Sequence, residues 1–206
     1  MTPQTAARVR RVFATAAMAF VVLYVSIDVV LQFLFPHYSV VSDAESDLAV
    51  GPFGWGMSLN FPARAAMSGC VVVAVAVTVP ASRLRTAGSV FLVLAGLCSA
   101  ALVFFPTDVN SAGEFGMTPR TTVGFVHVVF ATSGFLAVMV AMALLTLWIG
   151  RPRAVTGFFV VALAGLVLLG LSLAVLPQVV GLTERLCLAG ILGWAFVFSL
   201  GLRRLR

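Results

Sequence analysis

Six long apolar runs follow one another along the chain, separated by short polar stretches. A helix that crosses a membrane needs roughly 20 mostly apolar residues, and each run is close to that length or longer. The pattern therefore predicts an all-α fold, a single domain over residues 1–206 built as a six-transmembrane-helix bundle. We place the six spans near residues 13–35, 55–79, 87–105, 121–149, 155–176 and 184–202.

Composition supports lipid as the solvent for most of this surface. Hydrophobic residues make up 61% of the chain and charged residues 10%, whereas a water-soluble globular domain has about 25% charged residues. The net charge of +6 would suggest nucleic acid if the basic residues shared one soluble face. They are scattered between the apolar runs instead, so no nucleic-acid partner is expected.

The arginines predict the orientation of the bundle. Cytoplasmic loops of membrane proteins keep an excess of basic residues, and most arginines lie at the two ends of the chain and in the loops after the second and fourth runs: Arg8, Arg10, Arg11, Arg83, Arg85, Arg151, Arg153, Arg203, Arg204 and Arg206. All seven acidic residues belong to the opposite half: Asp28, Asp43, Glu45, Asp47, Asp108, Glu114 and Glu184. Both termini are therefore expected in the cytoplasm, with the chain in the cytoplasmic membrane, the inner membrane of a bacterium.

The first run resembles an export signal only superficially. Arg10 and Arg11 precede it, but the run is about 24 residues long, beyond the roughly 7–15 residues of a signal-peptide core. We interpret it as a retained membrane anchor.

The first outer loop, residues 36–52, has the pattern of a short helix. Ser42 and Glu45 have the spacing of a capping box, and Gly51-Pro52 ends the segment. A short helix lying on the membrane surface is expected here. Tyr38 and Ser39 precede it.

Metal binding is not expected. Asp43, Glu45 and Asp47 alternate like the start of a calcium loop, but the glycine and glutamate that such a loop needs further on are missing. His37 and His127 belong to no H-x-x-x-H or H-E-x-x-H pattern. The prediction is that the chain has no metal site and no cofactor.

Two charges fall inside the predicted spans. Asp28 and Arg64 each lie about two turns inward from the outer end of a span, and a charge in hydrocarbon costs at least ~2.5 kcal/mol. We predict that they form an ion pair or share a water-filled pocket. Asn60 lies one turn before Arg64 on the same helix face, and His127 enters the fourth span at a similar depth.

Polar groups also mark the start of the fourth and sixth spans. Thr118-Pro119-Arg120 and Thr183-Glu184-Arg185 each look like a helix cap. Capping explains the threonines and Glu184. It does not explain Arg185, whose charge is unfavourable at a helix N-terminus and so requires a partner such as Glu184, Asp108 or an anionic ligand.

These motifs together resemble an uncharacterised bacterial and archaeal family of multipass membrane proteins, domain of unknown function 998. The resemblance covers most of the chain and rests on short motifs: Tyr38-Ser39, residues 46–52, Gly54-Trp55, residues 105–108, Gly124 with His127, and residues 181–185. It implies a six-helix membrane fold without an established activity. It also implies that Asp47, Asp108, His127, Glu184 and Arg185 share one outer face.

Three functions are compatible with these residues. The first is a polar outer pocket that binds a lipid headgroup or another polar ligand, or an accessory subunit that binds a protein partner or a second copy of the chain. The candidate ligand-binding residues are Asp28, Asn60, Arg64, Arg120, Glu184 and Arg185.

The second function is an outer-leaflet lipid-modifying enzyme, with His127 as general base oriented by Asp47 or Asp108. No nucleophile is recognisable, which counts against it. The third is an ion- or proton-coupled carrier, which is weakened because no charge lies in the inner half of any span.

Overall fold

The structure is a computed structural model that describes residues 1–78, 81–110 and 115–205. The described residues form six long helices and two short 3₁₀ helices, and each long helix has the length and composition to cross a membrane. Glu114 and Arg206 lie outside the described residues. The elements are α1 (Pro3–Leu34), η1 (Glu45–Ala49), α2 (Gly54–Ala76), α3 (Arg83–Ala101), α4 (Thr122–Trp148), α5 (Arg153–Val175), η2 (Pro177–Val179) and α6 (Val180–Arg204).

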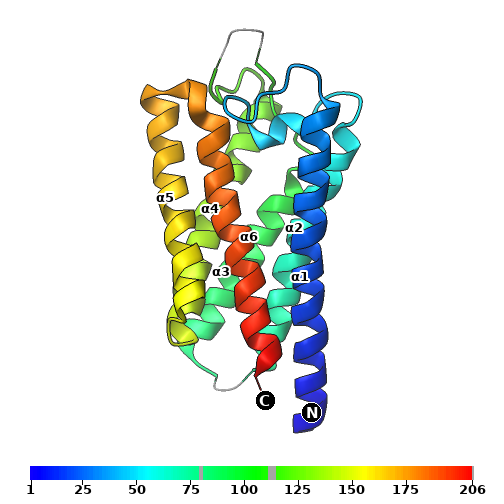
Figure 1. Cartoon of the computed structure of the whole chain (residues 1–206), viewed down its shortest axis with the longest axis vertical. Coiled ribbons are helices and arrows are strands. Elements are labelled where there is room, and N and C mark those ends of the chain that lie inside the picture. The colour runs from blue at the N-terminus through cyan, green and yellow to red at the C-terminus, as the bar shows by residue number, and fades with distance from the viewer. Residues whose placement is uncertain (79–80, 111–114, 206) are drawn as a thin grey trace.

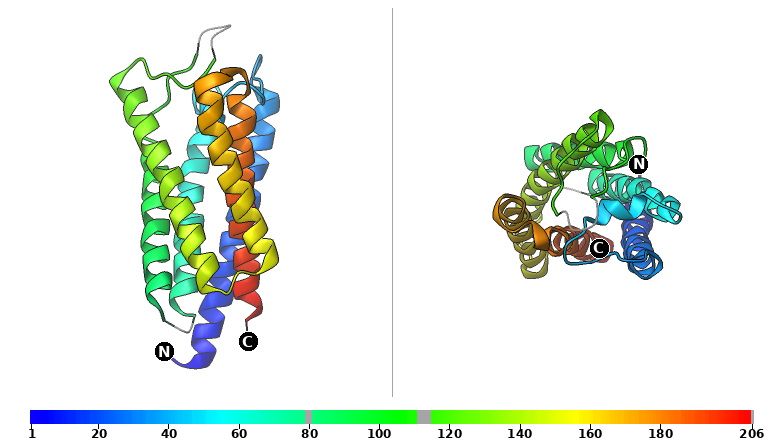
Figure 2. Two further views of the ribbon diagram at one scale, coloured as in Figure 1. Left: turned by 90° about the vertical axis from the view of Figure 1, so that its left-hand side faces the viewer. Right: turned by 90° about the horizontal axis from the view of Figure 1, so that it is seen from above.

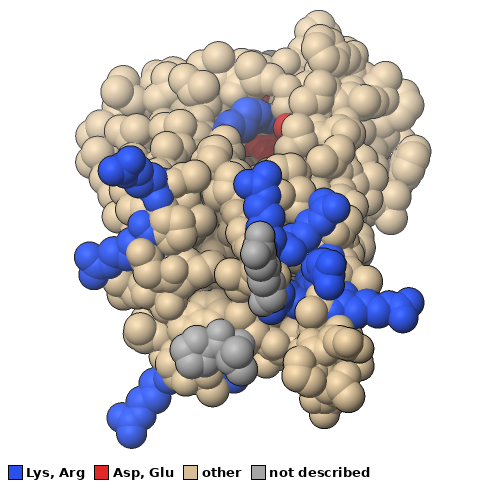
Figure 3. Space-filling view, turned by 60° about the horizontal axis from the view of Figure 1, so that its bottom comes forward, with Lys and Arg blue, Asp and Glu red and all other residues tan. Residues whose placement is uncertain are grey.

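The six long helices form an upright bundle (Figure 1), and seen from above they make a closed ring (Figure 2). Each helix packs against its neighbours in the sequence, and α6 closes the ring by packing against α1. The two termini lie at the same end of the bundle (Figure 1). Arginine side chains gather at that end (Figure 3), in agreement with the distribution from which we predicted a cytoplasmic location.

The six predicted spans are confirmed, and the boundaries differ most at the start of α1. This helix begins at Pro3, ten residues before the apolar run, because Thr2 caps it by accepting a hydrogen bond from the Thr5 amide at 3.2 Å. Proline at the first helical position adds no cost, since its missing N–H has no partner there anyway.

Both caps predicted for the fourth and sixth spans are wrong. α4 is capped by Thr121, whose Oγ1 accepts from the Gly124 amide at 2.9 Å, and not by Thr118. α6 begins at Val180, directly after η2, so Thr183 lies inside its first turn and its hydroxyl bonds Ser172 Oγ at 2.9 Å. The extra turn places the next residue, Glu184, inside the bundle.

The capping box predicted for the first outer loop is also wrong. Ser42 Oγ donates to Asp43 at 2.8 Å, and η1 starts after Ala44, whose amide donates to Asp47 at 3.1 Å. The short helix exists, but it is a 3₁₀ helix tucked into the outer end of the bundle, because Leu48 is fully buried there.

Leu48 belongs to a small outer core beneath η1, together with Leu31, Met57, Phe61 and Leu102. A larger core fills the remaining length of the bundle. Within it, Trp194 stacks on Phe198 with ring centroids 4.6 Å apart. The small core holds η1 against the start of α2.

Small residues let α5 and α6 approach each other closely. A Cβ on Gly165 would come within 2.3 Å of the Cys187 amide nitrogen, and one on Gly190 within 2.3 Å of the Ala162 amide nitrogen. Gly170, by contrast, has open space around it. Gly165 therefore serves packing within the chain.

Candidate functional site

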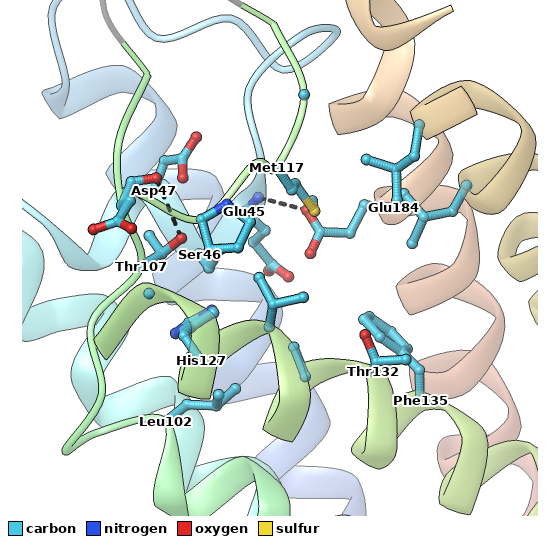
Figure 4. A pocket seen from close by; sticks show the side chains of 18 of the residues that line it. Glu45, Ser46, Asp47, Leu102, Thr107, Met117, His127, Thr132, Phe135 and Glu184 are labelled. Atoms are coloured by element: carbon cyan, nitrogen blue, oxygen red, sulfur yellow. Dashed lines mark hydrogen bonds between the residues drawn. The ribbon is translucent and has the colours of Figure 1, made fainter. Parts of the chain in front are cut away.

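A cavity of about 130 Å³ lies in the half of the bundle opposite the two termini, which the arginine distribution predicts to be the outer half. This is many times the roughly 10–15 Å³ that one water requires. Its polar wall comes from α1, η1, α2, the loop before α4, α4 and α6, and its apolar wall comes mainly from α4 and α5, with Phe61 from α2 and Leu102 directly after α3 (Figure 4). The polar lining residues are Tyr24, Glu45, Ser46, Asp47, Arg64, Thr107, Asp108, Thr118, His127, Thr132 and Glu184.

η1 forms the polar roof of this cavity. The backbone amide of Glu45 donates to Glu184 Oε2 at 2.7 Å, and the Tyr24 hydroxyl donates to Glu45 Oε2 at 2.9 Å. Glu45 is 4% exposed and Glu184 is 7% exposed. Two carboxyl groups from distant parts of the sequence are thus held side by side at the cavity wall.

The second oxygens of these two carboxyl groups have no partner among the described residues. In Figure 4 the free oxygen of Glu184 points into the cavity, and the Glu45 carboxyl extends in the same direction. Neither oxygen is among the fully buried, unpartnered side-chain atoms of the described residues, so both are accessible from the cavity. A bound group that donates hydrogen bonds can therefore reach them.

The surroundings of η1 raise the pKa values of its acidic side chains. Burial raises the pKa of Glu45 well above its ordinary value, and the nearby carboxylates of Asp28 and Glu184 raise it further, against an opposing effect of Arg64. Burial and the Glu184 carboxylate likewise raise the pKa of Asp47 from 3.8 to about 7. A positive charge entering the cavity would oppose these shifts, because it stabilises the ionised carboxylates.

Asp28 and Arg64 do not pair directly in the described structure. Asp28 accepts from Gln32 at 2.6 Å, and Arg64 donates from Nε to Ser99 Oγ at 2.9 Å while its guanidinium lies 5.9 Å from the Tyr24 ring centroid. Both residues instead act electrostatically on Glu45. Of these two residues, Arg64 lines the cavity and Asp28 lies outside the lining.

Asn60 lies between helices. It is fully buried and donates to the Tyr24 carbonyl at 3.1 Å, outside the lining of the cavity as described. Its contact joins α2 to α1 at the level of the cavity. This places Asn60 as a helix–helix contact behind Tyr24.

His127 reaches the cavity wall from the first turns of α4. It is 3% exposed, and its Nδ1 lies 2.7 Å from the Phe105 carbonyl oxygen. A carbonyl accepts only, so Nδ1 carries the proton and Nε2 is left as an acceptor. Nε2 has no partner among the described residues. The orienting group is thus a backbone carbonyl, and neither Asp47 nor Asp108 takes that role here.

Asp108 secures the loop before α4. Its carboxylate accepts from the Arg120 and Thr121 amides at 2.7 and 2.8 Å and from the Thr121 hydroxyl at 2.8 Å. These three hydrogen bonds lower the pKa of Asp108. Gly124 is needed beside it, because a Cβ there would come within 2.1 Å of Asp108 Oδ2.

Arg185 holds the first outer loop. Its guanidinium donates to the carbonyls of Val40 and Asp43 at 3.1 Å, and to the Tyr38 hydroxyl. The partner that we predicted for Arg185 from its place near a helix N-terminus is therefore the first outer loop. In the described residues neither Arg185 nor Arg120 lines the cavity, and Arg120 contributes its backbone amide to Asp108.

The apolar wall of the cavity lies between α4 and α5. Phe135 and Thr132 from α4 face Leu169 and Leu173 from α5 across it. Leu173 is 44% exposed and Thr132 is also exposed. Exposed residues of both helices thus line the cavity, and the two helices, which are joined at one end, stand apart at the other (Figure 2).

Sequence reasoning missed Glu45 and Tyr24 as site residues. Glu45 was interpreted as a capping residue, and Tyr24 lies in an apolar run whose periodicity does not distinguish a cavity wall from a helix contact. The available signal was that Glu45 is one of few acids in a chain with 10% charged residues. Among the described residues, no group of three or more His, Cys, Asp and Glu side chains could hold a metal ion.

Six apolar helices around a cavity at one end define a multipass membrane protein whose candidate site lies near one membrane face. The motifs that resemble a known family, in residues 46–52, 105–108, 124–127 and 181–185, surround this one cavity. The chain belongs to the family described as Protein of unknown function (DUF998), whose family model matches residues 8–201. Neither a curated protein nor a solved structure matches the chain.

Proposed function

We propose that this protein binds an amphiphile from the outer leaflet of the cytoplasmic membrane. The polar head occupies the cavity under η1, and the apolar part extends through the opening between α4 and α5. The proposal applies to membrane lipids and to other molecules with one polar end and one apolar chain. It makes the protein a lipid-binding membrane protein.

The observation that supports this proposal is the change of character along one continuous cavity. At the η1 end the wall has carboxyls, hydroxyls, Arg64 and His127, and at the α4–α5 end it is mainly apolar, with Phe135, Leu169 and Leu173 beside one hydroxyl, that of Thr132. A site for a small polar solute has no need of an apolar opening toward lipid. A site for an amphiphile requires both ends.

The opening can be tested by obstruction. Leu173→Trp places a large side chain in the opening, whereas Leu171→Trp adds the same side chain on α5 at a residue that is 54% exposed and outside the described cavity lining. Native mass spectrometry of protein extracted gently from its own membrane measures the bound lipid. We expect the Leu173→Trp variant to lose at least about tenfold of the bound amphiphile, and the Leu171→Trp variant to retain it.

Two outcomes contradict the proposal. One is a parent protein that carries no amphiphile under extraction conditions that preserve the fold. The other is equal loss of bound lipid in both tryptophan variants, because this would locate the lipid on the outer surface of α5 and not in the cavity.

A second function, catalysis at the same site, has one observation in its favour. The His127 ring is fixed by the Phe105 carbonyl with Nε2 as the acceptor at the cavity wall, which is the tautomer that a general base requires. His127→Gln keeps a polar side chain but removes the base. Comparison of lipid pools in cells with the parent and variant proteins tests this function, and unchanged pools contradict it.

A further inference from the structure

We propose that the headgroup that enters this cavity carries a primary ammonium group, held between the carboxylates of Glu45 and Glu184. This inference rests on the proposed function and specifies the chemical class of the ligand. The chemistry is shared by lipids with an amino headgroup and by soluble alkylamines and polyamines from the outer aqueous phase.

The charge balance of the wall favours a cation. Four acidic residues line the cavity, Glu45, Asp47, Asp108 and Glu184, against one arginine, Arg64. Asp108 is satisfied by three hydrogen bonds to the loop before α4. Glu45 and Glu184 meet at the roof, and each has an oxygen to which no described residue donates, whereas Asp47 lines the cavity on the other side of Glu45 (Figure 4).

His127 is an independent observation that points to the same kind of ligand. It is 3% exposed and lines the cavity, and its Nε2 is an acceptor to which no described residue donates. Carboxylate oxygens and an imidazole acceptor from η1, α6 and α4 thus lack hydrogen-bond donors. An ammonium group offers three N–H donors and a positive charge, so it satisfies several of these acceptors at once.

A phosphate or carboxylate headgroup fits the cavity poorly. Its one basic lining side chain, Arg64, donates to Ser99 and lies over Tyr24. An added anion would lie beside Glu45, Asp47 and Glu184 in a site of low dielectric, where like charges repel strongly. A trimethylated ammonium brings the charge but no N–H donor, so it leaves the acceptors unsatisfied.

Binding should depend on pH. The charged and titratable groups that act on Glu45 and Asp47 or line the same cavity come from several parts of the chain. They are Tyr24 and Asp28 from α1, Tyr38 and Asp43 from the first outer loop, Arg64 from α2, Asp108 and His127 from the loop before α4 and from α4, and Glu184 and Arg185 from α6. Because the pKa of Asp47 is raised to about 7, its carboxylate form is lost as the pH falls from 8 to 6. The ammonium ligand should therefore bind more weakly at pH 6 than at pH 8.

The experiment is a native mass-spectrometry titration of the whole protein in a non-ionic detergent. The probes share a dodecyl chain: dodecylamine, dodecyltrimethylammonium and dodecyl phosphate. Butylamine serves as a soluble amine without the long chain. At pH 8 we expect dodecylamine to bind at least about tenfold more tightly than dodecyl phosphate, as a charge-assisted hydrogen bond predicts, and to weaken at pH 6.

The variants test whether the roof acids are responsible. Glu45→Gln and Glu184→Gln preserve shape and remove charge, and each should weaken dodecylamine binding about tenfold. Asp43→Asn is the matched control, because Asp43 is an acid of the same loop outside the described cavity lining. Thermal unfolding in the same detergent checks that each variant is folded. If a variant fails to fold, the comparison of probes on the parent protein still decides.

Every outcome bears on the inference. Dodecyl phosphate binding as tightly as dodecylamine, blocked by Leu173→Trp, overturns the ammonium inference and leaves the proposed function standing. Dodecylamine binding that is unaffected by either glutamine variant also overturns it. Butylamine binding as tightly as dodecylamine supports the ammonium site but contradicts an amphiphile as its ligand. No binding of any probe overturns both.

Discussion

Glu45 shows how a single side chain acquires its properties from its surroundings. It lies in a polar loop, yet Tyr24, Asp28, Arg64 and Glu184 from three membrane helices determine its charge state. Burial in this group of side chains raises its pKa, and the same is true of Asp47. The acids of η1 therefore respond to pH in a range where exposed carboxyls remain ionised.

The raised pKa of Asp47 predicts a pH-dependent stability. The folded protein binds the proton of Asp47 more tightly than the unfolded chain does. The stability that this proton gives to the folded state is therefore complete below pH 3.8 and is lost as the pH rises through about 7. Asp47→Asn removes the titration but retains an acceptor for the Ala44 amide. In thermal unfolding at pH 5 and pH 8, we expect the variant to lose less stability between the two values than the parent.

Asp108→Asn is the control for this measurement. The pKa of Asp108 is lowered by its hydrogen bonds, so its stabilising contribution is present above its ordinary pKa of 3.8 and disappears only in more acidic solution. The variant should leave the difference between pH 5 and pH 8 unchanged. If Asp47→Asn also leaves that difference unchanged, Asp47 does not titrate in this range.

Gly124 in α4 is predicted to be as important for the stability of the fold as Asp108 beside it. Gly124→Ala directs a methyl group to within 2.1 Å of Asp108 Oδ2, which must then move away from the amides of Arg120 and Thr121. We expect a loss of about 1–3 kcal/mol in the free energy of unfolding. Gly69→Ala is the control, because Gly69 has no atom within 4 Å of an added Cβ and alanine favours helix. Equal stability of the two variants would contradict the close contact.

At the scale of elements, the site depends on how η1, α4 and α6 meet. Arg185 and Gly181 in the first turns of α6 receive the loop before η1: Arg185 donates to its carbonyls, and a Cβ on Gly181 would lie 2.3 Å from the Asp43 carbonyl oxygen. The loop is thus fixed over the end of the bundle, and Glu45 follows it. A longer or bulkier first turn of α6 would displace the roof of the cavity.

The pair α5–α6 is predicted to be sensitive to added volume. Gly165→Leu forces a side chain against the backbone at Cys187, where a Cβ alone would be 2.3 Å from the nitrogen, whereas Gly170→Leu meets open space on the same helix. We expect Gly165→Leu to lower the melting temperature in detergent strongly and Gly170→Leu to leave it close to that of the parent. Similar melting temperatures for the two variants would show that α5 and α6 are further apart.

At the scale of the whole molecule, the arginines predict the end that faces the cytoplasm. They gather at the end with the two termini (Figure 3), and the cavity occupies the other end, so the prediction places the cavity on the outer side. This determines which leaflet can supply the ligand. The orientation can be measured directly.

The measurement uses single cysteines in a variant without Cys70, Cys98 and Cys187. Gln178→Cys lies in η2 at the cavity end, and Ala81→Cys lies at the opposite end, and both positions are exposed. A membrane-impermeant thiol reagent on intact cells should label Gln178→Cys, and should label Ala81→Cys only after the membrane is permeabilised. The reverse pattern would place the cavity in the cytoplasm.

The family motifs could be found in the sequence, but the way in which they meet could not. Asp108 and His127 were recognised as outer-face residues, and the structure places both at the cavity. The expected contact between them does not form, because Asp108 bonds the start of α4 and Phe105 bonds His127. Which of several nearby acceptors a side chain takes depends on distances of a few tenths of an ångström, and helix periodicity does not specify those.

The sequence by itself determined the number of spans, their order and the end of the bundle at which the acids gather. These follow from hydrophobicity and charge, which act on each segment independently of its neighbours. The tertiary structure alone decided that Glu45 lies against Glu184, that Asp28 and Arg64 do not pair, and that exposed residues of α4 and α5 line the cavity. Each of these depends on the depth and rotation of one helix relative to another, which close packing of side chains determines only when all six helices are assembled.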